Sequence, residues 1–261
     1  SVDAGVDQYG GENDPEHIVD LVRSGELSEA RIDQSVRRIL LNKFELGLFE
    51  QSLVDEDAIP ALIRTPQYLA AGLEAQRKSI VLLNNKMADT AALPVAEGTK
   101  IFVDGLDANE AKRYGTVVDS ADQADVVVLY LPTIFNGNQA PGSDELMDQF
   151  LSTILPNDNL AFSPAVLDKA KGYSESARLI TVVDLNRPAI LTELNQLSDG
   201  LIGTFGVYDS VLFDVIFGQF SPQGKLPFEI PSSMTAVMAQ QEDMPDDSEA
   251  PVFEFGHGLS Y

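Results

Sequence analysis

Carboxylates are the most abundant groups in this chain that could do chemistry. The 261 residues include 41 Asp and Glu, 17 Lys and Arg, two histidines and no cysteine. Without cysteine there is neither a disulfide nor a thiolate ligand, and two histidines as far apart as His17 and His257 make a poor metal site. We therefore expect no metal and no other cofactor. The chemistry left open is that of carboxyl groups acting as general acid or base.

Three other kinds of site fail on spacing. Between Gly218 and Gly224 lie five residues where a phosphate loop has four, and Leu226 stands where Ser or Thr would hold magnesium. The pair Gly203 and Gly206 lacks the third glycine of a dinucleotide loop. No Gly-x-Ser-x-Gly sequence occurs. We predict neither nucleotide binding nor a serine hydrolase, and interpret Lys225 as part of a structural turn.

Net charge argues against two classes of partner. A formal charge of −24 repels phosphate backbones and anionic lipids, so we expect no nucleic acid and no membrane partner. The longest apolar runs are the length of strands, far below the roughly 20 residues of a membrane helix. The acidic run from Glu242 to Glu249 lacks the ligand spacing of a calcium loop and is interpreted as solvated.

Strand-sized apolar runs alternate with helical segments from Thr65 onward. Such continuous runs are typical of strands covered on both faces. The predicted fold is α/β, a predominantly parallel sheet flanked by helices (an α/β sandwich), preceded by a helical segment. Predicted strands are 79–83, 100–103, 124–131, 179–185 and 200–205, and predicted helices include 65–77, 108–114, 188–197 and 208–217.

Two capped helices are predicted before this region. Asp14 precedes Pro15 as a helix cap, with Gly25 as the stop, and Ser28 caps a second helix that ends at Gly47. Both have an apolar stripe, which an isolated segment must hide, so we expect self-association or packing on the sheet domain. The stripe residues are Ile18, Leu21, Val22, Ile32, Val36, Ile39 and Leu40.

The irregular stretch 133–164 follows the predicted strand 124–131. Ligands of open α/β sheets usually bind beyond the carboxyl ends of strands. The stretch contains one glutamate, Glu145, with Asp144, Asp148 and Asp158 as neighbours. A structural alternative is a short helix capped by Ser143, with Glu145 in its first turn.

Three segments together resemble glycoside hydrolase family 3, in the order found in that family. They are Arg31–Phe49 (RIDQSVRRILLNKFELGLF), Ser221–Pro231 (SPQGKLPFEIP) and Pro251–Tyr261 (PVFEFGHGLSY). The family's nucleophile is an aspartate in an N-terminal barrel, usually followed by tryptophan, and this chain has no tryptophan. The resemblance therefore implies the C-terminal portion of a larger enzyme. Residues 1–64 would be the helical end of the barrel with the linker, and residues 65–261 the C-terminal α/β sandwich domain.

The resemblance implies an exo-acting retaining β-glycosidase, a β-glucosidase, that hydrolyses terminal non-reducing sugars. Its partners would be a β-glucoside or oligosaccharide and the missing barrel, and its location periplasmic or secreted. The chain alone is expected to be inactive, because one of two carboxylates would be absent. The alternative is a non-catalytic carbohydrate-binding or scaffold domain.

Resemblance also gives Glu145 a role, because many relatives carry the acid/base glutamate on a loop in this region. Glu145 is the candidate catalytic residue, and the substrate-binding residues stay unassigned. The acid could also be displaced, supplied by the barrel, or absent. Asn186 and Arg187 could reach a sugar hydroxyl, although a structural role is the simpler interpretation. His17 is expected on a helix surface, and His257, between two glycines, against the core or the partner domain.

Overall fold

The structure, a computed structural model, describes residues 2–8, 14–86, 90–134 and 159–261. Two compact units divide the chain at Thr65 and Pro66. Among the described residues, no helix combines the length and apolar character needed to span a membrane.

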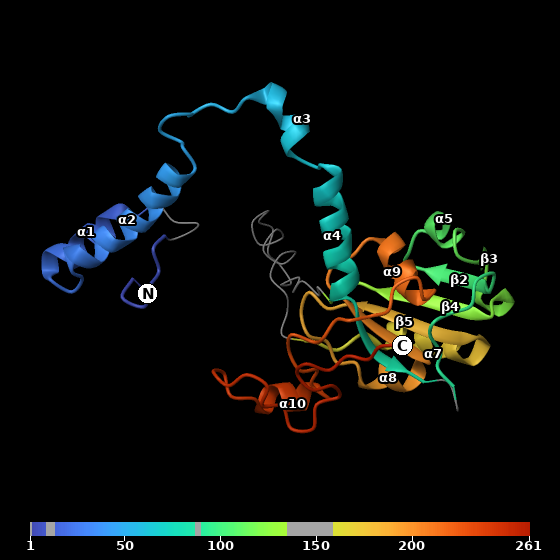
Figure 1. Ribbon diagram of the computed structural model, residues 1–261. Helices are drawn as coiled ribbons and strands as arrows, with labels where there is room; N and C mark the ends of the chain where they lie inside the picture. Colours follow the sequence, from blue (N-terminus) through green and yellow to red (C-terminus); the bar gives the residue numbers. More distant parts are fainter. Residues whose placement is uncertain (1, 9–13, 87–89, 135–158) are drawn as a thin grey trace, which may run out of the picture. The chain divides into compact units, whose positions relative to one another are not determined.

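The first unit is helical (Figure 1). Asp14 accepts a hydrogen bond from the backbone of His17 and begins α1, Pro15–Ser24, which ends at the left-handed Gly25. Ser28 caps α2, Glu29–Glu45, by accepting from the backbone of Arg31. Both predicted caps are confirmed. A 3-10 turn, Glu56–Ala58, and the short helix α3, Ile59–Leu62, follow.

Asp7 ties the start of the chain to α2. Its Oδ1 accepts from Ser35 Oγ at 2.8 Å and from Arg38 Nη1 at 3.0 Å, with Arg31 farther away at 3.5 Å. The hydrogen bond from Ser35 and the two guanidinium charges hold the pKa of Asp7 below its ordinary value, against a smaller opposing effect of desolvation.

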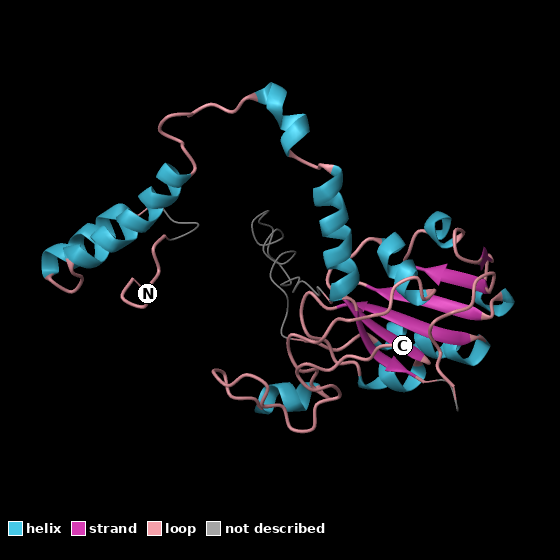
Figure 2. Cartoon of the chain, in the orientation of Figure 1, coloured by secondary structure: helices cyan, strands magenta, loops and turns pink. Residues whose placement is uncertain are grey.

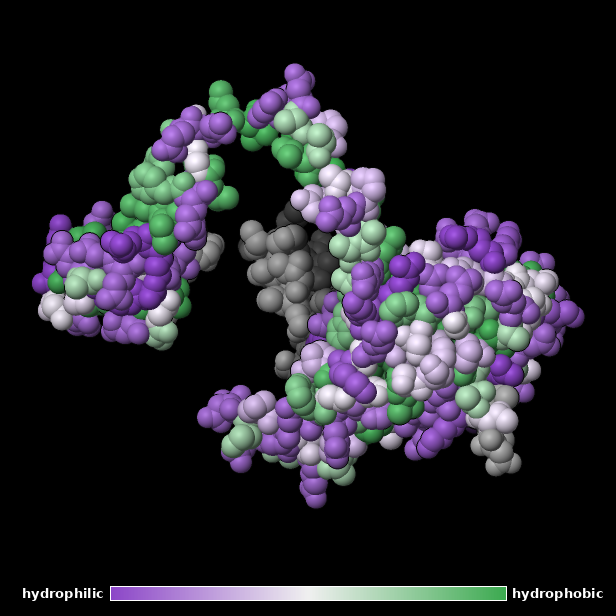
Figure 3. Space-filling view, viewed as in Figure 1, coloured by the Kyte–Doolittle hydropathy of each residue, from purple (hydrophilic) through white to green (hydrophobic). Residues whose placement is uncertain are grey.

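The second half of α2 leaves apolar side chains in solvent. Leu41 and Phe44 keep 52% and 59% of their surface exposed, and Val36 and Leu40 are also exposed. Figure 3 shows hydrophobic residues gathered in this helical unit. The predicted self-association of this stripe stays a prediction.

The second unit is a six-stranded mixed sheet covered by helices on both faces (Figure 2), so the predicted fold class is confirmed. The strand order is β1-β6-β5-β4-β2-β3, and only β1 runs antiparallel to its neighbour. The strands are β1 Val81–Asn85, β2 Lys100–Asp104, β3 Thr116–Val117, β4 Val126–Leu131, β5 Arg178–Asp184 and β6 Gly200–Thr204.

Alternate side chains of β4 and β5 pack into two hydrophobic layers, one on each face of the sheet. Val128 and Val182 face α9, Asp209–Ile216, whose Phe213 is fully buried. Val127 and Leu179 face the opposite layer, where Ala170 of α7, Pro164–Ser176, and Leu194 of α8, Thr192–Leu197, pack. This two-sided burial explains why the strands read as continuous apolar runs.

The remaining helices in the described part of the chain are α4, Pro66–Ser79, α5, Ala108–Ala111, and α10, Met234–Ala239, with a 3-10 turn at Ala121–Gln123. An ion pair fixes α4 to α9: Arg77 Nη2 lies 2.7 Å from Asp214 Oδ2, and Tyr114 donates to Asp214 Oδ1 at 2.7 Å. Burial, reinforced by this carboxylate, raises the pKa of Tyr114 to about 12.

Candidate functional site

The carboxyl ends of the parallel strands are the site that this topology favours. After β3 the chain crosses back past β2 to form β4, so the strand order reverses between β2 and β4. Ligands of open α/β sheets usually bind at such a reversal. The loop that follows β2 lies close against β4, because a Cβ on Gly105 would meet the carbonyl oxygen of Tyr130 at 2.9 Å.

Asp184 is the central carboxyl group at this edge. It is the last residue of β5, and its Oδ2 accepts from Asn186 Nδ2 at 3.0 Å and, at 3.5 Å, from the Tyr130 hydroxyl. Thr133 Oγ1 donates to the Asp184 carbonyl at 3.1 Å, which anchors the chain beyond β4. Among the described residues, no donor reaches the buried Oδ1. Burial raises the pKa of Asp184, although the hydrogen bonds oppose the shift.

Tyr130 stands between two acidic groups. Burial and the negative charges of Asp184 and Asp209 raise the pKa of its phenol. Asp209 begins α9 and its Oδ2 accepts from the backbone N–H of Asp107, 2.6 Å away, which joins the loop after β2 to this group. Tyr130, Asp184 and Asp209 therefore come together from three separated segments.

A neighbouring carboxylate, that of Asp104, forms an ion pair with a lysine. Asp104, at the end of β2, accepts from Lys169 Nζ at 2.6 Å and from the Tyr173 hydroxyl at 2.8 Å. Burial, with this hydrogen bond, raises the pKa of Tyr173 to about 12, so the phenol stays a neutral donor. Asp104 thus fastens α7 to the sheet.

The candidate catalytic residue Glu145 lies outside the described residues. Ser143, Asp144, Asp148 and Asp158, the other members of its proposed surroundings, fall in the same interval, 135–158. Thr133 and Ile134, both buried, are the last described residues before this interval. Glu145 stays a prediction.

Asn186 and Arg187 follow Leu185, the first residue after β5, and Asn186 is exposed at the same edge as Asp184. The sequence pattern predicts Pro188 in the first turn of a helix, but α8 begins only at Thr192. The predicted helix start is wrong because Pro188 and Ala189 belong to a link that runs beside 160–162, where Ile190 bridges Ala161.

Both histidines are accounted for. His17 lies exposed on α1, while the His257 ring contacts Leu83 O through Nε2 at 2.8 Å and stacks on Phe253, with centroids 4.7 Å apart. Lys225 Nζ donates to the Gly258 carbonyl at 2.6 Å, in agreement with a structural turn. Within the described ranges, no cluster of three or more metal-binding side chains occurs.

The sequence pattern places Asp184 near the end of a predicted strand, but it does not predict that Tyr130 and Asp209 are its neighbours. An acidic residue at the last position of an apolar strand could have drawn attention to Asp184. Nothing local indicates the other two, because Tyr130 reads as part of an apolar strand and Asp209 as a helix start. The three meet only through the sheet order.

The fold and this acidic edge define an α/β domain with a cluster of polar side chains at the carboxyl ends of its parallel strands. The family model described as "Glycosyl hydrolase family 3 C-terminal domain" matches residues 108–261. The chain belongs to this family, as the sequence resemblance predicted.

Curated relatives match along the whole chain. It is 38% identical over 270 residues to "Probable beta-glucosidase C" of Aspergillus flavus and 39% over 264 residues to "Beta-glucosidase C" of Emericella nidulans. It is 36% identical over 264 residues to the "Periplasmic beta-glucosidase/beta-xylosidase" of Dickeya chrysanthemi. In each case all of this chain is covered, but it spans only 40%, 41% and 39% of the relative.

Solved structures support the fold. The β-glucosidase of Listeria innocua in complex with gluconolactone has a TM-score of 0.71 at 22% identity, covering 100% of this chain and 43% of that one. The exo-1,3/1,4-beta-glucanase of a Pseudoalteromonas species has a TM-score of 0.68 at 21% identity, covering 99% and 37%.

Proposed function

We propose that this chain is the C-terminal part of an exo-acting, retaining β-glucosidase that removes terminal non-reducing glucose. The observation that carries the proposal is the match of the whole chain, at 36–39% identity, to relatives named as β-glucosidases. Residues 1–64 would be the helical end of the N-terminal barrel with the linker, and residues 65–261 the sandwich domain. The periplasmic relative favours an exported enzyme.

The carboxyl edge is the part of this domain that would face the substrate. Tyr130, Asn186 and the carboxylates beside them offer donors and acceptors suited to sugar hydroxyls. Retaining hydrolysis needs two carboxyl groups about 5–5.5 Å apart, one as nucleophile and one as acid. In this proposal the nucleophile comes from the N-terminal part, and the loop after β4 brings Glu145 to the leaving oxygen.

The test of the activity uses the full-length protein with cellobiose, an aryl β-glucoside and an aryl β-xyloside. We expect release of β-glucose before mutarotation, measured by proton NMR, and covalent labelling by a 2-deoxy-2-fluoro-β-glucoside, measured by intact mass. The xyloside is included because one relative's name gives both sugars. Absence of turnover and label together would favour the non-catalytic carbohydrate-binding or scaffold alternative.

The inactivity of this chain alone is tested separately. Without the nucleophile the covalent route is closed, so the purified 261-residue chain should release no aryl alcohol above background. Turnover by the chain that disappears on a single substitution within it would contradict this expectation.

Replacing Glu145 with Ala in the full-length enzyme tests the acid role. Cleavage of glucosides with poor leaving groups should slow by about 10²–10⁴-fold, the range of general acid–base catalysis. An activated aryl glucoside should suffer less at bond cleavage, and azide should restore its turnover by attacking the glycosyl intermediate without a base.

Asp144→Ala is the matched control, since it removes the adjacent carboxylate. If Glu145 only begins a helix, the two variants should both lose some thermal stability and keep near-normal kcat. That result on an unactivated glucoside would remove Glu145 from the reaction.

A further inference from the structure

A cavity lies along the outer edge of β1, and its lining shares no residue with the acidic edge described above. Its volume is about 740 Å³. Because β1 runs antiparallel to β6, its last residue, Asn85, pairs with Gly200 at the start of β6. The end of β1 is therefore at the opposite end of the sheet from Asp184.

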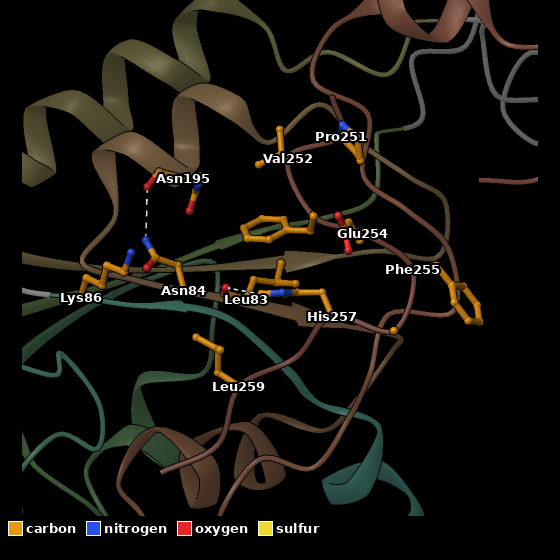
Figure 4. A pocket seen from close by; sticks show the side chains of 12 residues that line it. Leu83, Asn84, Lys86, Asn195, Pro251, Val252, Glu254, Phe255, His257 and Leu259 are labelled. Carbon is orange, nitrogen blue, oxygen red and sulfur yellow. Dashed lines mark hydrogen bonds between the residues drawn. The ribbon is translucent and has the colours of Figure 1, made fainter. Parts of the chain in front are cut away.

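Two segments distant in sequence build this cavity (Figure 4). Asn84, Lys86 and Asn195 lie at one end, and the C-terminal segment from Pro251 supplies the other end. The His257 imidazole lies between the two ends, beside Leu83 (Figure 4), and its ring packs against that of Phe253.

Hydrogen bonds and close packing hold these walls in place. Leu259 N donates to Leu82 O at 2.8 Å, and Asn84 Nδ2 donates to Asn195 O at 3.3 Å. His257 Nε2 must be the donor to Leu83 O, because a carbonyl can only accept. In the neutral ring Nδ1 then remains an acceptor.

The cavity keeps polar groups that the described part of the chain does not use. Lys86 and Glu254 are both exposed, and neither the ammonium nor the carboxylate has an ion pair or hydrogen bond to a described residue. They stand toward opposite ends, so the site carries one charge of each sign. Phe255 lies on the rim with 61% of its surface exposed.

We propose that this cavity is a second carbohydrate site that binds a neutral oligosaccharide away from the hydrolytic centre. A sugar ring has apolar C–H faces for the half-buried His257 ring, which packs on the buried Phe253, and hydroxyls that accept from Lys86 and donate to Glu254. The volume falls in the range of small-molecule sites, about 300–1,000 Å³. A net charge of −24 disfavours an anionic ligand. Only the choice of a β-glucan oligosaccharide rests on the proposed function.

The experiment uses the full-length enzyme with its hydrolytic centre blocked by a 2-deoxy-2-fluoro-β-glucoside. Cellotetraose and laminaritetraose are titrated calorimetrically against the blocked enzyme and two variants, Lys86→Met and Glu254→Gln. We expect saturable binding that weakens by about tenfold or more in each variant, as for a lost hydrogen bond to a charged group. Turnover of a small aryl glucoside by the unblocked variants should stay unchanged.

Lys100→Met and Glu97→Gln are matched controls, since both residues are exposed and lie outside the cavity. They should bind the oligosaccharides as the parent does. Thermal unfolding of all four variants checks that none is misfolded.

Absence of binding, or binding that ignores both cavity substitutions, would overturn the proposal. So would saturable binding of extended peptides in place of sugars, which would make the β1 edge a strand-docking site. Failure of the fluoroglucoside to label would count against the proposed hydrolysis. In that case the oligosaccharides are titrated against the unblocked protein. Weaker binding by Lys86→Met and Glu254→Gln would still place the bound sugar in the cavity.

Discussion

The acidic carboxyl edge and the β1-edge cavity differ in what their charged groups touch. At the carboxyl edge, Asp184 accepts a hydrogen bond from the Asn186 side chain, and Asp209 accepts one from the Asp107 backbone N–H. At the β1 edge, Lys86 and Glu254 reach no described residue, while backbone contacts close the walls. The first arrangement suits groups that hold one another in position, and the second leaves hydrogen-bonding capacity for a ligand.

The largest loss of stability is expected on the β1 side of this comparison, from Gly224→Ala. A Cβ there would lie 2.5 Å from the Ile80 carbonyl oxygen, a backbone atom that cannot move away cheaply. We expect a loss of about 2–4 kcal/mol in the free energy of unfolding, because overpacking of this kind strains the backbone. Urea unfolding of this chain measures it.

Gly172→Ala is the control for that substitution. Gly172 lies within α7 with open space around its Cβ position, so alanine should stabilise the helix by about 0.5–1 kcal/mol. Equal unfolding free energies for the two variants would show that the backbone at Gly224 does not pack tightly against Ile80, just before β1.

His257→Ala should give an intermediate effect. It leaves the Leu83 carbonyl without its side-chain donor and removes the stack on Phe253, for an expected cost of about 1–3 kcal/mol. His257→Gln, which can still donate, should recover part of the loss. His17→Ala, on an exposed helix surface, should be neutral in the same unfolding measurement.

The smallest effect should come from Asp184→Asn, and it should depend on pH. The folded state raises the pKa of Asp184, so its contribution to stability is fully present below the unfolded pKa and is lost as pH rises through the folded pKa. At neutral pH the uncharged Asn should therefore stabilise the fold by up to about 1 kcal/mol, an advantage that fades below roughly pH 4.

Asp119→Asn, away from the buried strand ends, serves as the reference for this pH series. Unfolding free energies of the three proteins between acidic and neutral pH provide the comparison. A gain from Asp184→Asn that is the same at every pH would show that burial of its charge is not the cause.

Local pattern was sufficient for five of the strands and for several helices, but it did not predict α7. Five apolar runs became strands because each is covered on both faces, and Asp14 and Ser28 cap their helices because one side-chain oxygen satisfies a nearby backbone donor. The sequence pattern does not reveal β3, which is only two residues long, and it places the start of α8 too early, at Pro188.

Tertiary structure alone decided which of these elements meet. The antiparallel placement of β1, the meeting of Tyr130, Asp184 and Asp209, and the cavity between β1 and the C-terminal segment all join residues distant in sequence. Periodicity reports which side of an element is buried but carries no information about its partner. Because partners are selected by long-range packing and backbone pairing, family membership could be predicted from the sequence, whereas the two polar sites required the fold.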